Sequence, residues 1–266
     1  MPALIRLSAL FIVAASFIPG KSKAQDVYES PRNANVPASG ARTVRVDAAA
    51  GSLRIEGHAG RTDVRVRGTA RSVRRDRLDD IKLIAERRGG EIYIKAEMPE
   101  TSSRDWRNFR NGPLQALDLV IEVPTTMALD VDDGSGEAVF LNTGALRLED
   151  GSGSVEVRGA RGDVEINDGS GNVELDGIEG NVEISDGSGE IRVRNVTGNV
   201  VIPDDGSGSI DIAGVGGTVR VNDDSSGSIE VDRVAGDFVV DSDGSGGISY
   251  TEVKGQVRIP ERKRRG

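Results

Sequence analysis

Residues 150–167 read DGSGSVEVRGARGDVEIN, and variants of this stretch recur through the second half of the chain. The tetrapeptide Asp-Gly-Ser-Gly first occurs at Asp133, and its aspartate returns after 17, 18, 18, 19, 19 and 19 residues. Self-similarity at a fixed period of about 18 residues is typical of a solenoid, in which each repeat packs on the next. The seven aspartates are Asp133, Asp150, Asp168, Asp186, Asp205, Asp224 and Asp243, and the motif at 224 reads Asp-Ser-Ser-Gly.

Each repeat contains two short segments in which apolar and polar residues alternate, as they do in half-buried strands. In the repeat at 150–167 the first strand would point Val155 and Val157 inward, and the second would point Val164 and Ile166 inward. We therefore predict an all-β fold, a parallel β-helix or β-solenoid with two strands per coil of about 18 residues. In the last repeat the predicted inward residues are Ile248, Tyr250, Val253, Val257 and Ile259.

The first 24 residues have the features of a signal peptide. Arg6 precedes an apolar run over residues 7–18, which is shorter than the ~20 residues that a membrane-spanning helix needs. Small residues precede Ala24, after which we expect cleavage. Since no later segment approaches 18 consecutive apolar residues, we expect a periplasmic or secreted protein without stable membrane insertion.

The N-terminal third follows a looser version of the repeat pattern. Residues 51–68 carry alternating strands at the ladder spacing and are interpreted as the first coil. Residues 81–86 and 91–96 flank an Arg-Arg-Gly-Gly turn and predict a hairpin. The predicted organisation is a signal peptide (1–24), a flexible linker (25–40), an N-terminal β-rich cap region (41–130), the solenoid repeats (131–260) and a basic tail (261–266).

Charge and composition narrow the possible partners and cofactors. Residues 25–116 carry 18 basic and 13 acidic groups, whereas residues 117–259 carry 9 basic and 29 acidic groups. So acidic a surface repels nucleic acid and anionic lipid headgroups, and we expect neither as a partner. Because the chain has no cysteine and one histidine, His58, it lacks the ligands of a Cys/His zinc site, and we predict no cofactor.

The segment Leu-Val-Ile-Glu-Val-Pro at 119–124, followed by repeated glycine turns and Val-x-Val strands, resembles the bacterial putative-adhesin family of β-strand repeats (domain of unknown function 4097). The resemblance covers roughly residues 40–260. It implies a parallel β-helix and brings no catalytic residues with it. The regular acidic turn departs from the family pattern.

The acidic turn is the first candidate site. Stacked carboxylates ~4.8 Å apart repel each other by nearly 1 kcal/mol per pair even in water. Each aspartate can cap its own turn by accepting from the following Ser and Gly amides, with solvent and salt screening the rest. The alternative is Ca²⁺, with Asp150, Asp168, Asp186 and Asp205 as candidate ligands. We favour capping and predict no metal, because the ligand position of the calcium β-roll repeat is occupied by valine here.

The second candidate site is the segment TSSRDWRNFRNG at 101–112. Its aromatic side chains lie between guanidinium groups, a mixture that can stack on sugars or on the face of a protein partner. A loop that caps the end of the solenoid would use the same residues. The candidate binding residues are Arg104, Trp106, Arg107, Phe109 and Arg110.

The outward-facing strand positions bear on catalysis. Glu156 and Glu174 supply the carboxylate pair that glycosidic chemistry needs, but no aromatic subsite accompanies them. The alternation more simply predicts cross-coil ion pairs, Glu174 with Arg192 and Arg192 with Asp211. We therefore expect no enzyme, but an adhesin or surface-binding module whose partner is an envelope or surface component, protein or glycan. The alternatives are a structural scaffolding protein of the envelope and, more remotely, a polysaccharide-active β-helix enzyme.

Overall fold

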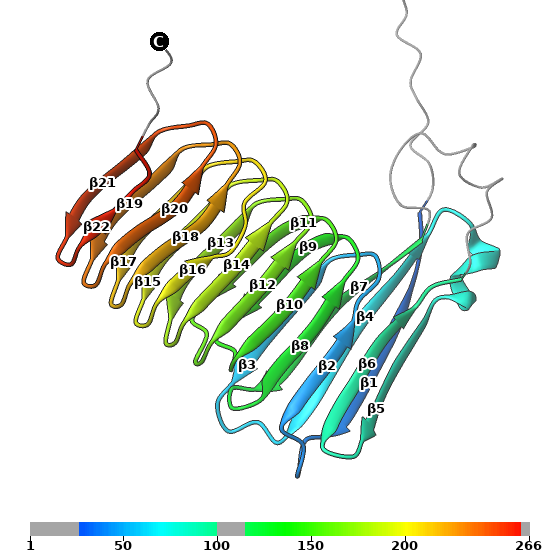
Figure 1. The fold of residues 1–266 in the computed structure, drawn as a ribbon. Coiled ribbons are helices and arrows are strands. Elements are labelled where there is room, and N and C mark those ends of the chain that lie inside the picture. Colours follow the sequence, from blue (N-terminus) through cyan, green and yellow to red (C-terminus); the bar gives the residue numbers. More distant parts are fainter. Residues whose placement is uncertain (1–26, 100–114, 262–266) are drawn as a thin grey trace, which may run out of the picture.

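The computed structural model describes residues 27–99 and 115–261, and these form two packed sheets of 11 strands each (Figure 1). Sheet A contains, in spatial order, β1 (Tyr28–Pro37), β4 (Asp63–Ser72), β7 (Gln115–Pro124), β3 (Leu53–His58), β9 (Gly136–Leu141), β11 (Gly153–Arg158), β13 (Val173–Ile178), β15 (Ile191–Val196), β17 (Ile210–Val215), β19 (Ile229–Val234) and β21 (Ile248–Val253). Sheet B contains β22 (Val257–Arg258), β20 (Phe238–Asp243), β18 (Val219–Asp224), β16 (Val200–Ile202), β14 (Val182–Asp186), β12 (Val164–Asp168), β10 (Leu146–Asp150), β8 (Ala128–Asp133), β2 (Thr43–Asp47), β6 (Glu91–Glu97) and β5 (Lys82–Arg88). A short 3-10 helix, η1 (Arg75–Asp80), precedes β5.

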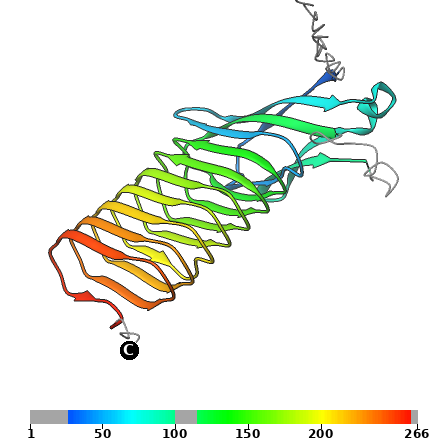
Figure 2. The same ribbon diagram turned by 90° about the horizontal axis from the view of Figure 1, so that it is seen from above.

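The predicted parallel β-solenoid is confirmed. From β8 onward the chain alternates between the two sheets, and each new strand pairs in parallel with the equivalent strand of the previous coil. Val155 lies opposite Val173, and Val173 lies opposite Ile191, so equivalent residues stack in register. Figure 2 shows these coils following one another along the length of the molecule. Within the described ranges no helix is long and apolar enough to cross a membrane.

The aliphatic ladders form the core, as predicted, as far as the last complete coil. Val157, Val193 and Ile184 are fully buried, and nearly all of their neighbours in the ladders are β-branched, which suits a pleated surface packed on both sides. The prediction is wrong for Tyr250 and Ile259, whose exposed fractions are 46 % and 40 %. These residues belong to the last coil, which has a neighbouring coil on one side only.

The N-terminal third is built differently from the predicted first coil. Residues 51–68 supply β3 and much of β4, and both strands lie in sheet A, whereas the two strands of a coil belong to opposite sheets. β4 runs antiparallel to both β1 and β7, and β7 lies between β4 and β3. The coil interpretation of this segment is therefore wrong, although Val64 and Val66 do point inward. The predicted hairpin is confirmed as β5 and β6.

The prediction of a flexible linker at 25–40 is wrong for residues 28–37, which form β1. All ten residues of β1 pair with β4, from Tyr28 opposite Ser72 to Pro37 opposite Asp63. Asn, Pro and Ser interrupt the alternation of apolar and polar residues in this segment. The strand is therefore determined by backbone pairing with a strand distant in sequence.

At one corner of each coil a residue adopts a φ between 51° and 74°. This residue is glycine or asparagine in most coils, but it is arginine or glutamate in the last two. The φ angles are 73° at Gly214 and 54° at Arg233. This conformation costs a residue with a Cβ ~1 kcal/mol or more relative to glycine. We expect Arg233→Gly to stabilise the protein by ~0.5–1 kcal/mol in urea denaturation, since the exposed ion pair that it loses with Asp232 contributes little. Gly214→Arg, the reverse change one coil earlier, should destabilise; a loss of stability in Arg233→Gly would contradict this account.

Candidate functional site

The seven repeat aspartates stack in one row, which we call the aspartate column: Asp133, Asp150, Asp168, Asp186, Asp205, Asp224 and Asp243. In β12 the buried positions Val164, Ile166 and Asp168 alternate with exposed Glu165 and Asn167, so the aspartate occupies an inward-facing position. The first six members of the column have exposed fractions of 5 % or less. The expectation that solvent screens these groups is therefore wrong, because the carboxyl groups belong to the interior.

Hydrogen bonds in the column show how each aspartate shapes its turn. The amide of Ser170 donates to Asp168 Oδ1 at 3.0 Å, and the amide of Ser188 donates to Asp186 Oδ1 at 2.9 Å. These are the Asx-type contacts expected of a turn cap. The second oxygens, Oδ2 of Asp168 and of Asp186, are buried and have no hydrogen-bond partner among the described residues.

Burial controls the protonation of the column. Loss of hydration raises the pKa of Asp133 to about 7, and the charge of Asp150 adds to this rise. Burial, together with the charges of Asp224 and Asp186, raises the pKa of Asp205 to about 7. Burial also raises the pKa values of Asp150 and of Asp186 to about 6. The solenoid therefore favours neutral carboxyl groups in its interior.

The column does not assemble the oxygen ligands that Ca²⁺ requires. Each coil contributes one carboxyl group, whereas Ca²⁺ takes six to eight oxygen ligands. Across residues 27–99 and 115–261, no three Asp, Glu or His side chains gather as a metal-binding group. Asp150, Asp168, Asp186 and Asp205, the candidate calcium ligands, are thus brought into one row without forming a cage.

Millimolar Ca²⁺ is expected to raise the melting temperature no more than NaCl of equal ionic strength, because it can act only by screening surface charge. A chelated ion that binds the folded state alone would add roughly 2.7 kcal/mol at 100 times its Kd. Thermal melts in the two salts, with EDTA as the control, make the comparison. Calcium-specific stabilisation that disappears in Asp168→Asn/Asp186→Asn would contradict the expectation.

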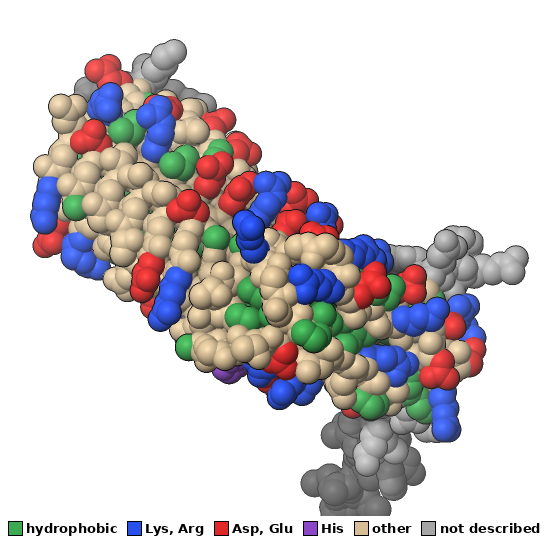
Figure 3. Space-filling view, turned by 90° about the horizontal axis from the view of Figure 1, so that it is seen from below, with side chains coloured by type: hydrophobic (Ala, Val, Ile, Leu, Met, Phe, Trp, Pro, Cys, Tyr) green, Lys and Arg blue, Asp and Glu red, His purple; other side chains and the backbone are tan. Residues whose placement is uncertain are grey.

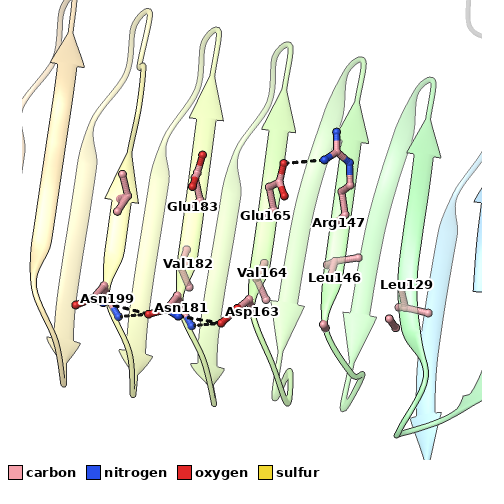
Figure 4. Close-up of a pocket in the computed structure, with 13 residues that line it drawn as sticks. Leu129, Leu146, Arg147, Asp163, Val164, Glu165, Asn181, Val182, Glu183 and Asn199 are labelled. Carbon is pink, nitrogen blue, oxygen red and sulfur yellow. Dashed lines mark hydrogen bonds and ion pairs between the residues drawn. The ribbon is translucent and has the colours of Figure 1, made fainter. Parts of the chain in front are cut away.

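A second row of polar side chains, absent from the sequence-based prediction, lies at the start of the sheet B strands (Figure 4). Asn181 donates its backbone amide to Asp163 Oδ1 at 2.8 Å, and the amide of Asn199 donates to Asn181 Oδ1 at 3.0 Å. The recurrence of a polar residue before the second strand of each repeat was the available signal. We call this row the corner ladder: Asp163, Asn181, Asn199, Thr218, Asp237 and Gln256.

A shallow groove of about 520 Å³ runs along the outer face of sheet B beside the corner ladder. Its other side is formed by outward residues of successive strands, Arg147, Glu165, Glu183 and Val201. Arg147 Nη1 donates to Glu165 Oε1 at 3.0 Å, as Figure 4 shows. The groove therefore crosses several strands, and successive coils present charged and polar groups to it.

The outer face of sheet A carries the other predicted outward residues. Arg192 Nε lies 3.9 Å from Asp211 Oδ2, which confirms one predicted ion pair. Glu174 lies opposite Arg192 in register. The second ion pair of the Arg192 guanidinium, however, is with Glu190 and not, as predicted, with Glu174. In Figure 3, which views the molecule from below, acidic and basic side chains lie interspersed mainly toward the margins of the surface. The candidate binding residues Arg104, Trp106, Arg107, Phe109 and Arg110 lie outside the described residues.

Two packed sheets, stacked glycine turns and continuous inward ladders define a parallel β-solenoid protein. The chain belongs to the Toastrack DUF4097 family, whose model matches residues 42–265, and this confirms the resemblance seen in the sequence. No functionally curated protein is significantly similar in sequence to this chain.

Comparison with solved structures finds similarity to proteins from several bacteria. A protein described as a "putative adhesin" from Bacteroides fragilis NCTC 9343 is 12% identical over 87% of this chain and 96% of its own, with a TM-score of 0.43. A "putative lipid binding protein" from Parabacteroides distasonis ATCC 8503 is 17% identical over 85% of this chain and 96% of its own, with a TM-score of 0.45. A "putative cell adhesion protein" from Clostridium sporogenes ATCC 15579 is 11% identical over 87% of this chain and 98% of its own, with a TM-score of 0.36.

Proposed function

We propose that the protein is an exported binding module of the cell envelope that acts by contact and not by turnover. The signal-peptide features of residues 1–24 support export. The observation that carries the proposal of binding is the groove on sheet B, because a solenoid presents an extended surface suited to an extended ligand. The descriptions of two solved relatives as adhesion proteins agree with this class of function.

The chemistry of the groove favours a polar, extended ligand. Arg147 neutralises Glu165, and Glu183, one strand further along, presents a carboxylate to the groove. Carboxylates and side-chain amides bind hydroxyl and ammonium groups through hydrogen bonds. A polysaccharide of the envelope, laid across the strands, would meet such a group in each successive coil, ~4.8 Å apart.

Binding to immobilised neutral and acidic envelope polysaccharides tests the proposal. In the groove, Glu165→Lys/Glu183→Lys is expected to weaken binding at least tenfold. The matched control is Glu156→Lys/Glu174→Lys, which makes the same charge change at neighbouring strands on the outer face of sheet A. Equal binding by both variants and the unaltered protein would contradict the groove as the site. Failure to bind any of these polymers would favour the scaffolding alternative.

The enzyme alternative has its own test. Glu156 and Glu174 lie opposite each other on β11 and β13, where they present two carboxylates to solvent. We expect no cleavage of the bound polysaccharides, measured as release of reducing ends. Cleavage that is abolished by Glu156→Gln or Glu174→Gln would establish a polysaccharide-active enzyme and overturn the proposal.

A further inference from the structure

The last coil leaves the ends of both sheets open in the part of the chain that the structure describes. β21 is the final strand of sheet A and β22 is the final strand of sheet B, at the end of the solenoid opposite β1 and β5 (Figure 1). Such sheet edges present unpaired backbone groups that can pair with another strand.

The repeat identifies the backbone groups that point out of this end. In the preceding coil, the amides of Gly227, Ile229 and Phe238 donate to carbonyls of the last coil at 2.9, 2.8 and 2.9 Å. Their equivalents one coil later are Gly246, Ile248 and Val257, whose amides consequently face away from the solenoid. Because these amide donors lie in both sheets, the backbone at this end can form hydrogen bonds with a partner strand in sheet A and in sheet B.

The end is also apolar at its centre. Tyr250 packs its ring against Phe238, with 5.9 Å between the ring centroids, and yet leaves 46 % of its surface exposed. Ile259 is 40 % exposed, and Ile248 and Val257 are only half-buried. In every inner coil the equivalent positions are covered by the next coil, so a partner that continues the stack would complete the core.

The opposite end is closed and does not match this surface. The Arg32 side chain of β1 donates to the carbonyl of Ile81 at 2.9 Å and to that of Leu78 at 2.9 Å, which joins sheet A to η1 and the start of β5. The edge strands there are β1 of sheet A, which contains Pro31 and Pro37, and β5 of sheet B, which carries Arg87 and Arg88. Prolines and charged residues on edge strands resist pairing. Head-to-tail stacking of copies is therefore disfavoured.

We propose that two copies of this chain associate through their open ends, tail to tail, around a twofold axis. The axis would place β21 antiparallel to the β21 of the partner copy, and an antiparallel pair uses the outward donors and acceptors of both strands. The two Tyr250 and Ile248 side chains would then meet at the centre of one continuous core.

The size of the open end suits a second copy as the partner. A coil end of roughly 30 by 20 Å would bury ~1,200 Å² in total, the lower end of the range for specific interfaces.

Sedimentation equilibrium of the full chain tests the association. We expect a dimer whose dissociation constant rises at least 30-fold in Tyr250→Glu, because two buried carboxylates would face each other. Tyr28→Glu is the matched control, since Tyr28 is an exposed tyrosine in β1 at the closed end, and it should leave the dimer unchanged. A protein that is monomeric at all concentrations, or a dimer that Tyr250→Glu leaves intact, would overturn the proposal.

Distance measurement keeps the proposal testable if Tyr250→Glu fails to fold. The chain has no cysteine, so Ser249→Cys and Glu29→Cys each provide a single, exposed labelling site. Spin labels at 249 should lie within ~2 nm of each other in the dimer, whereas labels at 29 should be separated by the length of two solenoids, ~10 nm. The reverse pattern, or a single intermediate distance for both sites, would rule out tail-to-tail association.

Discussion

Replacing Gly189 by alanine is expected to disrupt the middle of the solenoid. Gly189 has a φ of 150°, and a Cβ built there would all but coincide with the carbonyl oxygen of Gly171 in the preceding coil. The same amide donates to Ser207 in the following coil at 2.9 Å, so the turn cannot move without breaking the stack on both sides. We expect a loss of ~4 kcal/mol or more in the free energy of unfolding, measured by urea denaturation.

Gly187→Ala is the matched control within the same turn. Its φ is not left-handed, and an added Cβ would clash less deeply, with the carbonyl oxygen of Gly169. The equivalent position two coils later is Ser225, which carries a Cβ and still donates its amide to Asp205 at 2.9 Å. We therefore expect Gly187→Ala to cost only ~1–2 kcal/mol. Similar losses in the two variants would mean that the turns are not stacked as described.

Lowering the pH from 8 to 5 is expected to stabilise the protein. The folded-state pKa values of Asp133 and Asp205 are about 7, above the 3.8 of an ordinary aspartate, so the folded chain binds more protons than the unfolded chain in this range. Their contribution is fully present below pH 3.8 and is lost as the pH rises through 7. With ~1.4 kcal/mol per pKa unit, these two carboxyl groups together contribute roughly 5 kcal/mol between pH 8 and 5, which should raise the melting temperature by ~10 °C.

Other carboxylates determine the pH below which further acidification no longer stabilises the protein. Burial opposes ionisation of Glu122, but the hydrogen bond from Arg67 and the charge of Arg61 hold its pKa below the usual range. A carboxylate with a lowered pKa stabilises the fold above its unfolded pKa, near 4.5, and loses that contribution as the pH falls further. The stability optimum is therefore expected near pH 5.

Asp168→Asn/Asp186→Asn separates the column from the rest of the protein. Asparagine has the shape of a neutral aspartic acid and retains an oxygen that can accept from the amides of Ser170 and Ser188. This variant should be more stable than the unaltered protein at pH 8 and should respond less to acidification. Glu183→Gln, which neutralises an exposed carboxylate, is the control and should leave the pH profile unchanged. A pH profile that is the same in all three proteins would contradict the role of the column.

The sequence predicted the coils because their period is local and repeated. Alternation correctly assigned the interior positions from Val155 to Val240, and the same alternation, followed one step beyond Ile166, would have placed Asp168 inside as well. We expected a solvated turn there because a charged residue next to glycine usually marks one. The alternation pattern thus indicated that the aspartates of the column are buried, but the prediction gave more weight to residue type.

The N-terminal third could not be derived in the same way. β7 is inserted between β3 and β4, although β3 and β4 are consecutive in the chain, and β1 is defined only by its pairing with β4. These pairings join residues far apart in sequence and leave no periodic pattern. The corner ladder was missed for a different reason, since its members change identity from Asp163 to Asn181 to Thr218 while keeping the same hydrogen bond.

Carbon-13 NMR of the aspartate side chains, recorded as the pH is varied, tests most directly the claim that a buried row of carboxyl groups runs through the solenoid. The account expects at least four aspartate carboxyl signals, those of residues 133, 150, 186 and 205, to titrate between about pH 5.5 and 7.5. The signal of residue 186 should disappear in Asp168→Asn/Asp186→Asn. If every aspartate titrates below about pH 4.5, the carboxyl groups are solvated and the central claim is wrong.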